Sequence, residues 1–166
     1  MEEVKAPNKL IEKDNHKKIF LAGSIEMGKA EKWQDRVSKA LKDEDVILYN
    51  PRRDDWDSSW EQKKENKQFR EQVEWELDAM DKAELIIMYF DKDTKSPITL
   101  LELGLHANHN KLLVCCPEGF WRKGNVDIVC ERYGIKQVDT IDDLIESLKN
   151  SKMNETIQEM VDKIIK

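Results

Sequence analysis

The chain has 166 residues and carries 34 acidic against 28 basic side chains, which gives a formal net charge of −6 at pH 7. Charged residues make up 37% of the chain, well above the roughly 25% of an ordinary soluble domain, and 39% of its residues are apolar. That apolar content suffices for one buried core and excludes disorder over most of the chain. The sequence contains no apolar run of membrane-spanning length and no signal peptide, and its net negative charge disfavours binding to duplex nucleic acid. We therefore expect one cytoplasmic domain over residues 1–166, with small molecules or proteins as partners.

The cysteines and histidines do not form a ligand pattern. Cys115, Cys116 and Cys130 are odd in number and lack C-x-x-C spacing, so we expect reduced, structural thiols. His106 and His109 stand three residues apart without a third acid or thiol nearby. The sequence therefore predicts no metal site and no cofactor.

The first half of the chain alternates short apolar runs with helical patterns. Residues 1–16 are predicted to be a polar lead-in, and the run 17–23 is predicted to be a buried strand that ends in glycine. A second strand is expected over 45–49, followed by a loop over 51–60 and a long helix over about 61–82. The helix between the two strands is marked by apolar residues at helical spacing: Ala30, Trp33, Val37, Ala40 and Leu41.

The second half repeats this alternation. A third strand is expected over 84–90, a fourth over 111–116 and a short fifth over 135–138. Ser96 followed by a proline is typical of a helix start, and C-terminal helices are expected over 140–166. The helix between the fourth and fifth strands is marked by Val126, Val129, Cys130 and Tyr133, and the last amphipathic segment by Ile157, Met160, Val161, Ile164 and Ile165.

Strands that are near-continuous apolar runs, alternating with helices, predict a parallel sheet covered on both faces. We expect a doubly wound α/β fold, flavodoxin-like, with four or five strands in the order 2-1-3-4-5. Ligands of such sheets bind beyond the carboxyl ends of the strands, at the switch point between the first and third strands. The segments after residues 23 and 90 are therefore the candidate site.

Two carboxylates fall inside otherwise apolar helical patterns near this switch point. Glu102 lies among leucines in the helix after the third strand, and Glu76 shares the apolar stripe of the long helix. Gly104, which weakens a helix interior, suggests close packing beside Glu102. Each glutamate is either a solvated edge residue or a working group, and two carboxylates at one site are what glycosyl chemistry uses.

The segments at the other strand ends carry further candidates. Gly23 and Ser24 would allow close backbone approach and a hydroxyl contact, or form a plain turn; the sequence has no dinucleotide or triphosphate motif. In the loop after the second strand, the pair Arg52-Arg53 could bind a phosphate or carboxylate, and Trp56 could stack on a base. Alternatively, the arginines of this loop pair with its own aspartates.

Several segments in order resemble the nucleoside 2-deoxyribosyltransferase family and its nucleotide N-glycosidase relatives. They are IFLAGSI (19–25), Glu76 ahead of AELIIMYF, SPITLLELGL (96–105) and GFWRKGNVDIVCERYGI (119–135). The Glu-Leu-Gly helix after the third strand is the most specific of them.

The resemblance implies roles for individual residues. Glu102 would be the nucleophile that attacks C1′ of a 2-deoxyribosyl group, and Glu76 would contact or protonate the base. Ser96 matches a position that is Asp in the transferases and Ser in the nucleotide glycosidases. Asn125, by default a helix N-cap, resembles an Asn that a neighbouring subunit lends to the nucleophile, which implies a homo-oligomer. Independently of the resemblance, Asn50 and the loop after it follow the second strand, so we expect them on the same rim of the sheet, lining the substrate site.

Phe20 departs from the family pattern, which commonly has a tyrosine in the first strand whose hydroxyl contacts the nucleophile. Three functions therefore stay open. The leading one is base exchange between deoxynucleosides, with nucleosides, nucleotides and free nucleobases as partners. The others are hydrolysis of a nucleoside or nucleoside 5′-monophosphate, and a non-enzymatic nucleotide-binding module.

Overall fold

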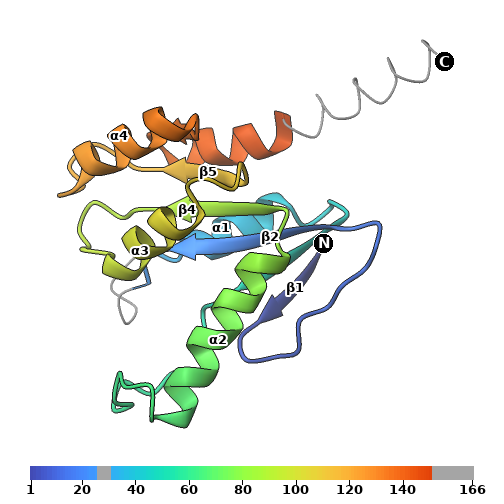
Figure 1. The fold of residues 1–166 in the computed structure, drawn as a ribbon. Helices are drawn as coiled ribbons and strands as arrows, with labels where there is room; N and C mark the ends of the chain where they lie inside the picture. The colour runs from blue at the N-terminus through green and yellow to red at the C-terminus, as the bar shows by residue number, and fades with distance from the viewer. Residues whose placement is uncertain (26–30, 151–166) are drawn as a thin grey trace.

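The fold is a six-stranded, wholly parallel sheet with helices on both faces (Figure 1), in a computed structural model that describes residues 1–25 and 31–150. The strands are β1 (Glu2–Lys5), β2 (Lys17–Gly23), β3 (Val46–Asn50), β4 (Leu85–Tyr89), β5 (Leu112–Cys115) and β6 (Lys136–Val138). Their order in the sheet is β1-β3-β2-β4-β5-β6, with every neighbouring pair parallel. The predicted doubly wound architecture is confirmed, and β2 to β6 have the predicted order.

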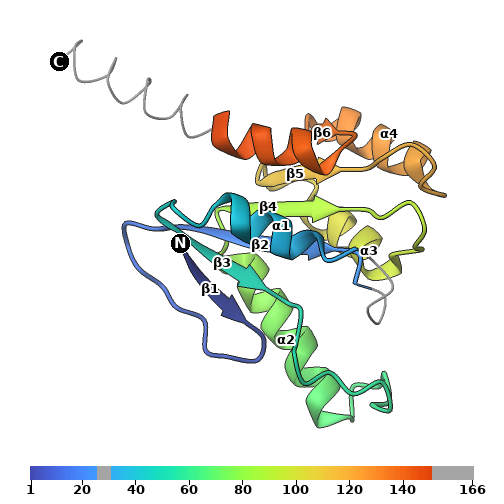
Figure 2. The same cartoon turned by 180° about the vertical axis from the view of Figure 1, so that it is seen from behind.

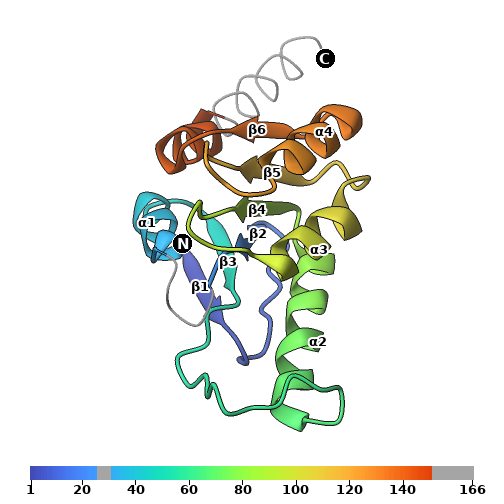
Figure 3. The ribbon, with the colours of Figure 1, turned by 90° about the vertical axis from the view of Figure 1, so that its left-hand side faces the viewer.

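The helices divide between the two faces of the sheet, as the end-on view in Figure 3 shows. They are α1 (Trp33–Ala40), α2 (Lys67–Lys82), α3 (Pro97–His106) and α4 (Lys123–Tyr133), and residues 141–150 are also helical. The helices α2, α3 and α4 pack into one core and α1 and 141–150 into the other. Figure 2 shows α1 and the helix over 141–150 from behind.

Strand β2 has apolar side chains on both faces of the sheet, so helices must cover both faces. Its successive side chains point to opposite faces, so Phe20 and Ala22 join the core under α2 and α3 while Ile19 and Leu21 join the core under α1. All four residues are buried. This is the pattern expected of a central strand in a parallel sheet.

Strand β1 corrects the prediction of a polar lead-in over residues 1–16. Residues 2–5 pair in register with β3, from Glu2 opposite Ile47 to Lys5 opposite Asn50. Only Val4 of this strand is buried, because an edge strand turns alternate residues to solvent. A single apolar residue carries no detectable alternation, so the sixth strand was missed.

Helix α2 begins at Lys67 and not near residue 61 as predicted. The side chain of Asn66 accepts a hydrogen bond from the backbone N–H of Phe69 at 2.9 Å and thereby caps the helix. Residues 51–66 form the loop before it. Thr140 caps the helix over 141–150, since its Oγ1 accepts from the backbone N–H of Asp143 at 3.1 Å. The apolar pattern over 157–165 lies outside the described residues.

Cys115, Cys116 and Cys130 are buried, free thiols, as predicted. Burial raises the pKa of the first two to about 12 and of the third to about 11, so they stay protonated. In the part of the chain that the structure describes, no helix is long and apolar enough to cross a membrane.

Candidate active site

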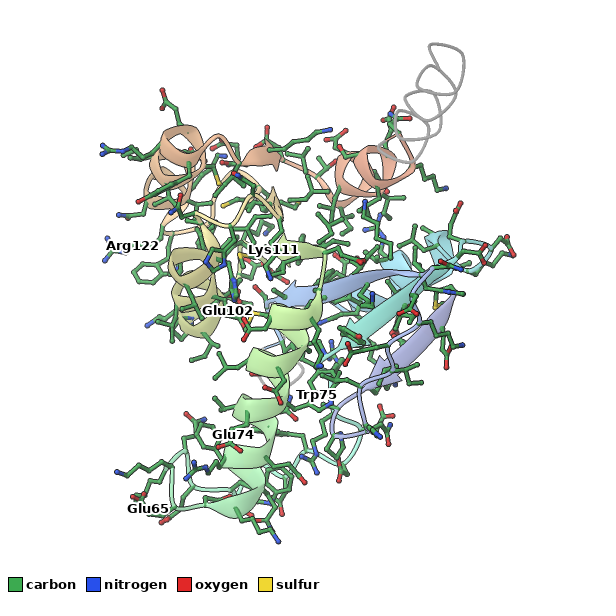
Figure 4. All side chains as sticks on the ribbon, turned by 45° about the vertical axis from the view of Figure 1, so that its right-hand side comes forward. Glu65, Glu74, Trp75, Glu102, Lys111 and Arg122 are labelled. Carbon is green, nitrogen blue, oxygen red and sulfur yellow. The ribbon has the colours of Figure 1, made fainter. Side chains whose placement is uncertain are left out.

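Two glutamates from different helices come together beside the carboxyl ends of the central strands. Glu102 lies in the second turn of α3 and is buried, with 8% of its surface exposed, and Glu76 lies in the middle of α2 and is partly buried. Figure 4 shows Glu102 where α3 approaches α2. The two carboxyl groups that the sequence singled out lie close enough for the charge of Glu76 to act on Glu102.

Both carboxyl groups are shifted toward their neutral forms. Burial raises the pKa of Glu102 to about 8, with the charge of Glu76 as a second cause. Burial also raises the pKa of Glu76 to about 7, against the opposing effect of a hydrogen bond from Gln72. Within residues 1–25 and 31–150, no group donates a hydrogen bond to the Glu102 carboxyl. Near neutral pH this arrangement favours one proton on the pair.

A cluster of three buried hydroxyls holds the start of α3 against the end of β2. Thr94 Oγ1 lies 3.0 Å from Ser24 Oγ and 2.7 Å from Ser96 Oγ, and the two serine hydroxyls are bonded to each other. Ser24 Oγ also accepts from the backbone N–H of Asp91 at 2.9 Å. The cluster therefore fixes the entry of the helix that carries Glu102.

Ser96 occupies the predicted N-cap position of α3, with Pro97 at the first helical position, but it does not cap with its side chain. Its backbone is left-handed, with φ 44°, and its hydroxyl bonds to Ser24 and Thr94 instead. The expected capping bond is thus replaced by the hydroxyl cluster.

Gly23 ends β2 and pairs with Tyr89 of β4. Its φ is +149°, and a Cβ built on it would lie 2.5 Å from the carbonyl oxygen of Tyr89 and 2.9 Å from Cζ2 of Trp33. No side chain fits there. Gly104 differs, because a Cβ at this position meets no described atom within 4 Å. The expectation of close packing beside Gly104 is therefore wrong within this chain.

Phe20 lies in the core on the face that carries α2 and α3, with 1% of its surface exposed. It pairs with Tyr49 of β3 and Ile86 of β4. As a phenylalanine it has no hydroxyl with which to hold Glu102, and none of the described residues donates to that carboxyl.

The polar residues after β3 are bound within the protein. Asn50 donates to Glu3 Oε1 at 2.8 Å and accepts from the backbone N–H of the next arginine at 2.9 Å. The Arg53 guanidinium pairs with Asp55 at 2.7 Å and Glu71 at 3.1 Å. The alternative in which this loop's arginines pair with its own carboxylates is therefore present for Arg53, and substrate contacts of these residues stay predictions.

The aromatic residues of the same loop pack against each other. The rings of Trp56 and Trp60 are 5.2 Å apart, edge to face, and the guanidinium of Arg53 lies 5.0 Å from the centre of the Trp60 ring. Both tryptophans are partly buried. Stacking of Trp56 on a base stays a prediction.

Asn125 is not the N-cap of α4, since Arg122 holds that position and Asn125 is the third helical residue. It is exposed, and no hydrogen bond joins it to Glu102 in the described part of the chain. An exposed residue can act on a neighbouring molecule, so its predicted role in a second subunit stays untested.

Gln72 is a site residue that the sequence analysis missed. Its Nε2 donates to Glu76 Oε1 at 2.8 Å and to the carbonyl oxygen of Pro51 at 2.8 Å. The one available signal was its position four residues before Glu76, which places both on the same side of α2.

Other features of the structure lie apart from the pair of glutamates. A hollow of about 460 Å³ lies beyond β4 and β5, and its four carboxylates against one lysine make it unsuited to a phosphate. Its charged lining residues are Glu31, Asp91, Lys92, Asp93 and Asp139. Among the described residues, no group of three or more His, Cys, Asp or Glu could hold a metal ion.

The family relationship agrees with this site. Residues 16–120, which include β2 to β5 and both glutamates, match the family described as nucleoside 2-deoxyribosyltransferase like. A search of curated proteins gave no match. With well over half of its length matched, the chain belongs to the nucleoside 2-deoxyribosyltransferase-like family.

Proposed function

We propose that the protein transfers a 2-deoxyribosyl group between nucleobases through a covalent intermediate on Glu102. The observation that carries the proposal is the pair formed by Glu102 and Glu76, two neighbouring carboxyl groups with raised pKa values in a chain of the nucleoside 2-deoxyribosyltransferase-like family. A buried carboxylate without hydrogen-bond donors is a stronger nucleophile than a solvated one.

The chemistry needs one proton on the pair, and that proton must pass from Glu102, the group with the higher pKa, to Glu76 before the attack. The Glu102 carboxylate attacks C1′ of the deoxyribose, the C1′–N bond breaks, and Glu76 gives its proton to the departing base. A second base then attacks C1′, the ester bond to Glu102 breaks, and the incoming base returns a proton to Glu76. Both carboxyl groups end in their starting states, as a transferase requires.

Hydrolysis is the second candidate, with a nucleoside or nucleoside 5′-monophosphate as substrate and water in place of the incoming base. Two observations favour keeping it. Ser96 places a hydroxyl in a buried cluster at the N-terminus of α3, where backbone N–H groups attract anions. Phe20 also leaves Glu102 without a phenol to orient it.

We further propose that the active form is a homo-oligomer. Several large apolar side chains on α3 and at α4 are exposed, and apolar groups on a protein surface are typical of interaction sites. They are Ile98, Leu101, Leu105, Trp121 and Ile128. Asn125 lies on the same helix as Ile128, so a second copy that covers this face would bring its Asn125 near the first copy's α3. Size-exclusion chromatography with light scattering tests this, and a monomer at micromolar concentration would contradict it.

The decisive experiment is chromatography of an incubation with a deoxynucleoside and a foreign free base. Base exchange predicts a new deoxynucleoside with the wild type and none with Glu102→Ala. Free base without acceptor would support hydrolysis. Intact ligand binding without any product at high protein concentration would leave a binding module and overturn the enzymatic proposal.

A further inference from the structure

The Gln72 side chain clamps the Glu76 carboxyl to the chain after β3. Gln72 is buried, with 5% of its surface exposed, and lies one turn before Glu76 on α2. Its two amide N–H groups go to two different acceptors, Glu76 Oε1 and the carbonyl oxygen of Pro51, each at 2.8 Å. The amide therefore joins the candidate acid to the first residue beyond β3.

The orientation of this amide is determined by its surroundings. The Pro51 carbonyl can only accept, so the amide nitrogen and not its oxygen must face it. The amide oxygen of Gln72 is then left buried and without a hydrogen-bond partner. A buried unpaired acceptor destabilises the folded state, and an apolar side chain of similar size would avoid this cost. The two N–H groups, and not the oxygen, therefore explain why an amide side chain is buried at this position.

Few charged groups act on the Glu76 carboxyl. The charged group coupled to Glu76 from a neighbouring element is Glu102 of α3. Within the described ranges, no lysine, arginine or histidine pairs with Glu76, and Gln72 is its hydrogen-bond donor. Among the described residues, Gln72 is therefore the group that holds the Glu76 carboxyl in place and favours its ionised form.

We propose that Gln72 is a positioning residue that aims the Glu76 carboxyl at the shared site and steadies its carboxylate after the proton has left. The inference rests on the proposed function, in which Glu76 gives a proton to the departing base. A hydrogen bond to the charged form of an acid lowers its pKa. Removing it should therefore make Glu76 hold its proton to higher pH and deliver it from a less defined position.

The test compares Gln72→Met and Gln72→Asn with the wild type. Methionine keeps the length without the amide, and asparagine is too short to reach both acceptors. The carboxyl carbons of ¹³C-labelled glutamates are titrated by NMR, with the Glu76 signal assigned from Glu76→Gln. We expect the Glu76 titration to move upward by about half a pH unit or more. We also expect kcat to fall by about tenfold, with KM less affected.

Gln68→Met is the matched control, because Gln68 lies one turn earlier on the same helix and is exposed. It should leave both the titration and kcat unchanged. An unshifted Glu76 titration in a folded Gln72 variant would overturn the inference. Failure of both Gln72 variants to fold, with Gln68→Met folded, would assign Gln72 a structural role and overturn it too. If the wild type lacks glycosyl activity, the proposed function fails, while the NMR titration still decides the role of Gln72.

Discussion

Glu76 and Glu102 stand on different helices, α2 and α3, yet the charge of Glu76 adds to the effect of burial in raising the pKa of the Glu102 carboxyl. Two like charges in a poorly solvated place oppose each other, so the pair favours the state with one proton. That state contains both groups that glycosyl transfer needs, a carboxylate and a carboxylic acid. The relation between these residues therefore yields separate predictions for the leaving group, the pH profile and stability.

Replacing Glu76 by glutamine should matter most for substrates whose base needs a proton to depart. General acid catalysis contributes about 10²- to 10⁴-fold, so we expect Glu76→Gln to lose about a hundredfold or more in kcat with an ordinary purine deoxynucleoside. An N7-methylated purine leaves as a neutral base without a proton, and its cleavage should be much less affected. Steady-state kinetics on the two substrates measure the difference.

The control for this comparison is Glu74→Gln. Glu74 is exposed on the same helix and pairs with Arg70 at 2.6 Å, and Figure 4 marks its place. It should behave as the wild type with both substrates. Equal losses on both substrates in Glu76→Gln would contradict an acid role for Glu76.

The pH dependence of kcat/KM should be bell-shaped. Below the lower pKa of the pair both carboxyls are protonated and no nucleophile exists; above the higher one both are ionised and no acid remains. With pKa values of about 7 for Glu76 and about 8 for Glu102, the maximum should fall between pH 7 and 8. A profile that is flat from pH 5 to 9 would mean that the pair does not titrate during catalysis.

The same pair should make the folded state less stable as pH rises. Because both folded pKa values exceed the ordinary value of 4.5, the folded state binds more protons than the unfolded state between pH 4.5 and 8. Stability then falls with rising pH across this window. Glu102→Gln removes one titrating group, so it should match the wild type near pH 5 and exceed it at pH 8 by on the order of 3 kcal/mol.

Urea unfolding of wild type and Glu102→Gln at both pH values measures this difference directly. Comparing the two proteins at each pH cancels the contributions of the titrating groups that do not interact with Glu102. A stability difference that stays constant between pH 5 and 8 would show that Glu102 has the same pKa in the folded and unfolded states.

The features that could be predicted from the sequence are those that depend on neighbouring residues in the chain. Strands β2 to β5 are continuous apolar runs, and both glutamates are carboxylates inside apolar stripes, so both signals lie in the residues themselves. Strand β1 was not predicted because only one of its four residues, Val4, is buried, and one apolar residue gives no strand pattern. The role of Gln72 could not be predicted from the sequence because its partner, the Pro51 carbonyl, is 21 positions away in the chain. Such contacts exist only after the sheet has formed.

Gly23 and Gly104 offer opposite responses to the same substitution. In Gly23→Ala the new Cβ would lie 2.5 Å from the Tyr89 carbonyl oxygen. A backbone atom in a central strand cannot move away cheaply, and the positive φ adds strain, so we expect a loss of about 2–4 kcal/mol in unfolding free energy. The shift would also separate β2 from β4 beside the hydroxyl cluster, and activity should fall with stability.

Gly104→Ala should instead stabilise the protein by about 1 kcal/mol. Alanine is a better helix former than glycine in a helix interior by that amount, and the new Cβ meets no described atom within 4 Å. Urea unfolding of both variants under identical conditions measures the two effects. Because Gly104 lies on α3 between the exposed Leu101 and Leu105, destabilisation by Gly104→Ala would mean that another molecule packs closely at this position. A loss that depends on protein concentration would identify that molecule as a second copy of the chain.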